Sequence, residues 1–159
     1  MNKRLALGIF YELIWVVIAV VAAVVLIFPY RHDISFAFMR YLFCALFLVF
    51  TYFRFVAFMM RSVVLENVWV KLGLFILNFP LFFLMLNKYF DYIDVFNEYN
   101  YTLATNVFQH IKSGTDVEEL LYLKRLTIFS GIISMMMIVL LQLRIVYAIF
   151  KLRQFDKYL

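Results

Sequence analysis

The sequence predicts an all-α, polytopic integral membrane protein with four transmembrane helices and a helical outer loop between helices three and four. The composition is 67% hydrophobic and only 16% charged, whereas soluble domains are nearer half apolar and about one quarter charged. Four apolar runs are also long enough to cross the hydrocarbon core of a bilayer. We therefore expect a single membrane domain over residues 1–159, with the lipid bilayer as its solvent.

The first two spans are expected at residues 8–28 and 38–60. Pro29 ends the first span, because proline removes a backbone donor and clashes with the preceding helical turn. The uncharged run before it is longer than the apolar region of a usual signal peptide, so we interpret it as an uncleaved anchor. A short connection leads to the second span and predicts that the two helices are antiparallel neighbours.

The third and fourth spans are expected at residues 68–88 and 126–150. Pro80 lies inside the third span and predicts a kink there. In the fourth span, Ser130, Gly131 and Ser134 are small residues. Such residues permit close approach of another helix, either within the bundle or from another subunit.

Residues 91–125 form the one sizeable polar region, and we expect an amphipathic helical segment at the outer surface. Its first part has apolar side chains at helical spacing, namely Phe96, Tyr99, Leu103, Val107, Phe108 and Ile111. Gly114 is expected to end that helix, and Thr115 with Glu118 forms a capping-box pattern for the next one. A helix that begins at Asp116 can then continue into the fourth span over about 35 residues.

Basic residues near the ends of the spans predict the orientation. With the N-terminus inside, the short inner segments carry Lys3, Arg4, Arg61, Lys71, Lys151, Arg153 and Lys157 against only Glu66 and Asp156. We therefore expect both termini in the cytoplasm and, most simply, a bacterial inner membrane. The formal charge of +5 is spread along the ends of the spans and is not gathered into a patch, so we expect no nucleic-acid partner.

An intramembrane polar layer is the candidate functional feature. Each expected span contributes a polar side chain about two turns from its cytoplasmic end, and the layer consists of Glu12, Arg54, Asn78, Gln142 and Arg144. Arg54 is notable because a charge inside hydrocarbon is unfavourable unless it finds a partner or reaches the interface.

Two interpretations of the layer remain open. In the structural one, Glu12 pairs with either Arg54 or Arg144 and holds the bundle together, while the other arginine extends to the interface. In the functional one, the surplus positive charge binds an anionic lipid headgroup, an anion, or an acidic side chain of a partner subunit.

The sequence lacks the motifs of several kinds of catalytic or cofactor site. The two histidines, His32 and His110, lie outside the expected spans, so neither a bis-histidine haem nor a histidine-rich metal centre is expected within the bundle. No span contains Glu-x-x-His, and no nucleotide-binding glycine motif occurs. We expect no catalytic residues, no metal and no cofactor, and hence no enzyme.

The sequence thus favours a non-catalytic accessory or scaffold subunit of a larger membrane protein complex, with other membrane subunits as partners. The alternatives are a small homo-oligomeric channel or transporter for anions, in which the arginines select the ion, and a lipid-binding membrane protein.

Overall fold

A computed structural model describes residues 3–31, 34–58, 67–97 and 117–155 of the chain. These residues form four α-helices, α1 (Lys3–Ile27), α2 (Phe36–Phe58), α3 (Val68–Asn97) and α4 (Val117–Phe155), and a short 3₁₀ helix, η1 (Phe28–Tyr30). Each α-helix is long and apolar enough to cross a membrane. The predicted all-α class with four potential spans is confirmed.

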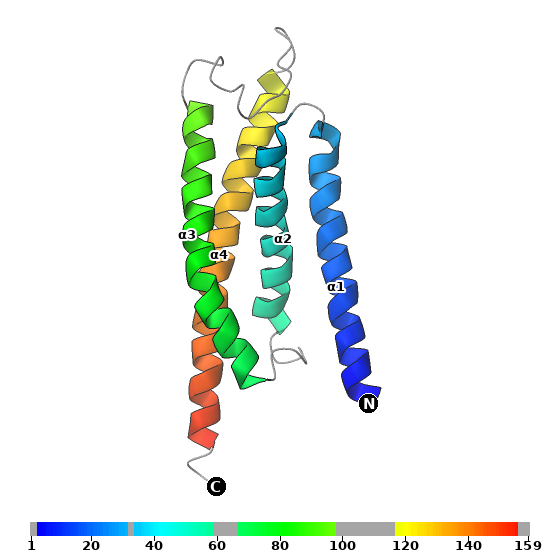
Figure 1. Cartoon of the computed structure of the whole chain (residues 1–159), viewed down its shortest axis with the longest axis vertical. Helices are drawn as coiled ribbons and strands as arrows, with labels where there is room; N and C mark the ends of the chain where they lie inside the picture. Colours follow the sequence, from blue (N-terminus) through cyan, green and yellow to red (C-terminus); the bar gives the residue numbers. More distant parts are fainter. Residues whose placement is uncertain (1–2, 32–33, 59–66, 98–116, 156–159) are drawn as a thin grey trace.

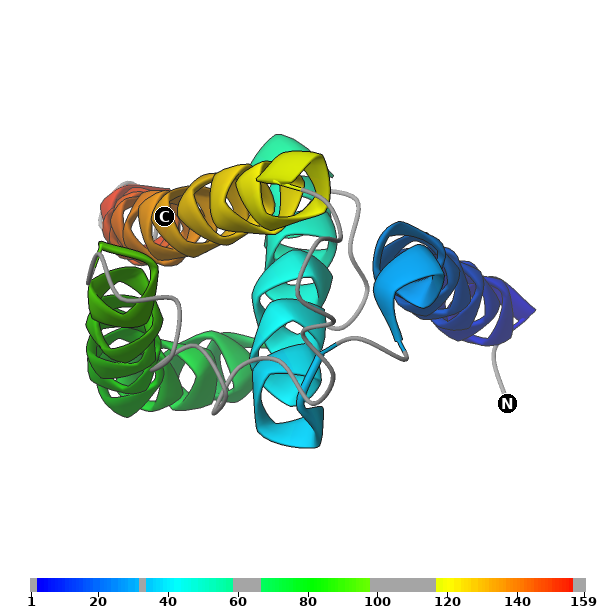
Figure 2. The same cartoon turned by 90° about the horizontal axis from the view of Figure 1, so that it is seen from above.

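The four helices run alternately up and down (Figure 1). Lys3 and Phe155 lie at the same end of the bundle, which we call the terminal end. At the opposite end, which we call the turn end, η1 connects α1 to α2. Helix α4 packs against both α2 and α3, whereas α1 packs chiefly against α2 and stands to one side of the other three (Figure 2).

Helix α4 has one buried face that follows helical spacing. Its fully or nearly fully buried residues are Leu123, Thr127, Ser130, Gly131, Ser134, Ile138, Leu141 and Ile145. The buried hydroxyls bond to backbone carbonyls of their own helix: Thr127 Oγ1 donates to Leu123 O at 2.7 Å, and Ser134 Oγ donates to Gly131 O at 2.8 Å. The middle of this face, from Thr127 to Ser134, therefore has small buried side chains whose hydroxyls are bonded, and it allows close packing.

Gly131 is the point of closest approach on that face. A Cβ built on Gly131 would overlap Cδ2 of Tyr89 on α3 and lie 2.8 Å from the hydroxyl oxygen of Tyr41 on α2. The small residues of α4 thus serve packing within this chain, which was one of the two interpretations of their spacing.

The ends of α3 and α4 differ from the expected spans. Helix α3 continues past Lys88 to Asn97, because its aromatic side chains pack on α2: the ring of Phe38 contacts Tyr92 and Phe96 with centroids 4.9 and 5.8 Å apart. Residues 91–97 of the expected outer segment thus belong to α3, and residues 117–125 belong to α4. Residues 98–116 lie outside the described residues. Helix α4 is continuous for 39 residues, or about 58 Å.

Helix α1 buries only one narrow face. Glu12, Ala19, Ala23 and Ile27 are the buried residues on its described part, at spacings of seven and four. Most of its other side chains are large, apolar and exposed. Such a helix is suited to an apolar environment around the bundle.

Candidate functional site

Two residues of the predicted polar layer, Asn78 and Gln142, each form a hydrogen bond to a neighbouring helix. The Tyr52 hydroxyl of α2 donates to Oδ1 of Asn78 on α3 at 2.7 Å. The Nε2 of Gln142 on α4 donates to the backbone carbonyl of Phe75 on α3 at 2.8 Å. These bonds connect α3 to both of its neighbours in the part of the helix just before Pro80.

Pro80 lies on α3 directly after these polar contacts and disturbs the helix beside them. Proline has no N–H, so the carbonyl of Ile76 loses its helical donor, and the proline ring distorts the preceding turn. Helix α3 bends in this region (Figure 1). Asn78 is fully buried beside the bend, and the bond from Gln142 reaches a carbonyl of the distorted turn. The two amides therefore link the bent part of α3 to its neighbours α2 and α4.

Among the described residues, two buried atoms of this group find no hydrogen-bond partner: Nδ2 of Asn78 and Oε1 of Gln142. One is a donor and the other is an acceptor. The buried Thr51 hydroxyl on α2 likewise has no hydrogen-bond partner in the part of the chain that the structure describes. Sequence reasoning identified both amides but missed Tyr52, because a tyrosine in an aromatic-rich span carries no signal that its hydroxyl is the one that bonds.

Glu12 on α1 and Arg54 on α2 form an ion pair, through Oε2 and a terminal guanidinium nitrogen. Both side chains are largely buried, with 11% and 14% of their surface exposed. The guanidinium also lies 5.8 Å from the ring centroid of Trp15 and 5.9 Å from that of Phe55. Carboxylate and aromatic faces together compensate a cation that has little water around it.

Trp15 extends this contact between α1 and α2. Its indole Nε1 donates to the backbone carbonyl of Phe50 at 3.5 Å, a long hydrogen bond. Trp15 lies three residues after Glu12 and hence on the same side of α1. The ion pair with Arg54 and the indole bond therefore lie on one face of α1 and join it to α2. The polar pattern of the sequence did not reveal that Trp15 contributes to this contact.

Arg144 does not share the carboxylate of Glu12. It is half-buried on α4, two residues after Gln142, and so about 3 Å nearer the terminal end than the bond to Phe75. Lys71 lies one turn before Phe75 on α3, about 6 Å nearer the same end, and only 7% of its surface is exposed. Within the described ranges, no acidic side chain pairs with either cation.

The predicted layer thus separates into three parts. Glu12 and Arg54 form a compensated pair. Asn78 on the kinked helix accepts a bond from α2, and Gln142 donates a bond from α4 to that helix. Arg144 is not paired with Glu12. Among the described residues, no three His, Cys, Asp or Glu side chains lie close enough together to hold a metal ion.

Comparison of the chain with protein-family models, with curated proteins and with solved structures found no match.

Proposed function

We propose that this chain is an integral membrane protein that serves as a non-catalytic accessory or scaffold subunit of a larger membrane complex. The observation that carries the proposal is the one-sided packing of α1. That helix buries a single face against α2 and presents large apolar side chains elsewhere, including Val17 and Val25 at 60% and 62% exposure. An apolar surface around a helix faces either lipid or the helices of a partner.

The polar contacts support the same proposal. The ion pair of Glu12 with Arg54, the bond of Tyr52 with Asn78 and the bond of Gln142 with Phe75 each join two helices of this chain. Their chemistry is that of helix association, which in an apolar environment depends on such bonds and on close packing. A subunit that offers an ordered apolar surface to partners needs this internal bonding.

Purification in mild detergent tests the proposal directly. We expect tagged chain to elute with other membrane proteins in fixed ratio, measured by mass photometry and by identification of the recovered proteins. Val17→Trp on the exposed face of α1 should lower that recovery without lowering the yield of the chain itself. Met136→Trp, at a comparably exposed position on α4, is the matched control. A chain that is monodisperse and stable alone, with no partner in fixed ratio, would overturn the proposal.

A second candidate function, an anion channel or anion-binding protein, is favoured by a different observation. Lys71 and Arg144 lie toward the terminal end and have no acidic partner among the described residues. Two such cations would attract an anion or an anionic headgroup. Anion flux in reconstituted vesicles that falls in a Lys71→Gln, Arg144→Gln double variant would support this candidate, and the absence of flux would remove the channel form of it.

For orientation, we propose a bacterial inner membrane with both termini in the cytoplasm. The support is the basic residues of the short inner segments and the position of Lys3 and Phe155 at one end of the bundle.

A further inference from the structure

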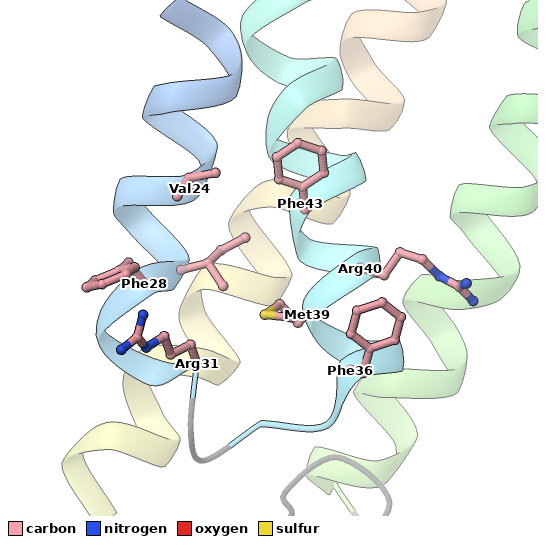
Figure 3. Close-up of a pocket in the computed structure, with 8 residues that line it drawn as sticks. Val24, Phe28, Arg31, Phe36, Met39, Arg40 and Phe43 are labelled. Atoms are coloured by element: carbon pink, nitrogen blue, oxygen red, sulfur yellow. The ribbon is translucent and has the colours of Figure 1, made fainter. Parts of the chain in front are cut away.

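A pocket lies between α1 and α2 at the turn end (Figure 3), remote from the polar layer. Its volume is about 350 Å³, and it is lined by Val24, Ile27, Phe28, Arg31, Phe36, Met39, Arg40 and Phe43. Ligand pockets usually fall between roughly 300 and 1,000 Å³. This pocket is therefore large enough to hold part of a ligand, and it is larger than the small voids between packed side chains.

The lining of the pocket changes along α1 from apolar to cationic. Val24 lies seven residues before Arg31, so the apolar wall extends about 10 Å from the level of the arginine toward the middle of the bundle. Six of the eight lining residues are aliphatic, aromatic or thioether side chains, and the other two are arginines. Arg31 follows η1 and Arg40 is in the second turn of α2, so both cations lie toward the turn end.

Arg31 is held at the edge of the pocket by an aromatic contact. Its guanidinium carbon lies 4.3 Å from the ring centroid of Phe28, and Figure 3 shows the two side chains next to each other. A guanidinium carries five N–H donors in a planar fork that can bind two phosphate oxygens together. Arg40 lines the pocket but directs its guanidinium toward α3 (Figure 3), so it contributes its stem and a more distant positive charge.

We propose that this pocket binds an anionic phospholipid, with one acyl chain between α1 and α2 and the phosphate on Arg31. The proposal rests on the membrane insertion given under the proposed function, because it requires the turn end to lie at a membrane surface. The complementarity is between an amphiphile with a negative head and a pocket with an apolar wall and a cationic edge. A free phosphate would leave the apolar wall without a ligand.

The two parts of the pocket have different effects on binding. Lipid tails in a bilayer are already surrounded by hydrocarbon. The apolar wall therefore contributes a shape that fits an acyl chain, but transfer of the chain into the pocket yields little free energy. Selection among lipids must therefore come from the charge of the headgroup at Arg31. Two kinds of variant separate these contributions: one that removes the charge and one that fills the apolar space.

The experiment measures lipid retained by full-length chain after reconstitution in an equimolar mixture of phosphatidylglycerol and phosphatidylcholine. We expect native mass spectrometry to show phosphatidylglycerol enriched on the wild-type protein. Arg31→Gln should reduce that enrichment about fivefold, which corresponds to about 1 kcal/mol for one cation at a membrane surface. Met39→Trp, which fills the pocket but leaves both arginines, should reduce total retained lipid of either kind.

Matched controls are available on α4. Arg125→Gln removes an exposed arginine that does not line the pocket, and Met136→Trp adds the same bulk at an exposed position elsewhere. Both should retain the wild-type enrichment. If wild type holds the two lipids equally, or if Arg125→Gln lowers the enrichment as much as Arg31→Gln does, the site is refuted.

The failure of this inference is distinguishable from the failure of the proposed function. Membrane fractionation shows whether the chain inserts, and its partners are recovered independently of lipid identity. A chain that is in the membrane and recovers partners but shows no headgroup preference refutes the lipid site alone. A chain that remains in the soluble fraction refutes both.

Discussion

At the residue scale, the pair of Glu12 with Arg54 explains how an arginine is accommodated between apolar helices. Arg54 has 14% of its side chain exposed and lies beside two aromatic rings. Removing its carboxylate partner would leave a cation with little solvation, and the loss of one partner of a buried pair is more destabilising than the loss of both. Disruption of the pair at Glu12 alone should therefore lower the stability of the chain.

We predict that Glu12→Gln lowers the stability of the chain by about 3 kcal/mol, which corresponds to a fall in Tm of roughly 10 °C for a chain of this length. Thermal unfolding in mild detergent, followed by fluorescence or size exclusion, measures the change. The Glu12→Gln, Arg54→Gln double variant should be more stable than Glu12→Gln alone. If the single variant unfolds at the wild-type temperature, the pair has no structural role.

Tyr52 makes a second residue-scale contribution. Tyr52→Phe would remove the 2.7 Å hydrogen bond and leave Oδ1 of the fully buried Asn78 without its donor. We expect a loss of about 1 kcal/mol, because hydrogen bonds between helices in apolar surroundings are modest in net strength. Tyr11→Phe, at an exposed tyrosine of α1, is the control and should be neutral by the same unfolding measurement. Equal stability of both variants would contradict the assignment.

At the element scale, the packing of α4 depends on the lack of a side chain at residue 131. We predict that Gly131→Ala destabilises the bundle by about 1–3 kcal/mol, because the added methyl would overlap Tyr89 and press on the Tyr41 hydroxyl. Gly73→Ala on α3 is the matched control, since a Cβ there would have no atom within 4 Å. The control should be neutral or slightly stabilising, as alanine has the higher helix propensity. Comparable losses in both variants would show that helix flexibility, and not the contact, determines the effect.

The positions of the helices were largely predictable because hydropathy and proline placement are local properties. The continuation of α3 to Asn97 was not, since Lys88, Asp91 and Asp94 make its last turns look like a loop. Those turns are stabilised by ring contacts with Phe38, which is distant in sequence. Counting turns singled out the polar side chains of the spans, but it did not reveal that Glu12 pairs with Arg54 and not with Arg144. That pairing follows from α1 packing on α2, and side-chain periodicity does not reveal which helices are neighbours.

At the scale of the whole molecule, α1 is joined to a three-helix unit that has its own contacts. Helix α4 lies against α2 and α3, and the Asn78 and Gln142 bonds tie α3 to these two helices. Helix α1 adds the ion pair of Glu12 with Arg54 and the pocket at the turn end. The ion pair and the pocket both include charged side chains, and the Trp15 indole bond to Phe50 is a further contact between α1 and α2. Variants at these places should affect the attachment of α1 first.

The alternating direction of the four helices leads to a prediction about topology. If all four cross the membrane, Lys3 and Phe155 must be on the same side, because they lie at one end of the bundle. Reporter fusions to the N-terminus and to the C-terminus, one active only in the cytoplasm and the other only outside it, measure this for each end. We expect both ends to report the cytoplasm, since the short segments at that end carry the excess of Lys and Arg. Opposite readings would refute insertion of four helices, whereas two external readings would retain the four spans and refute only the orientation inferred from charge.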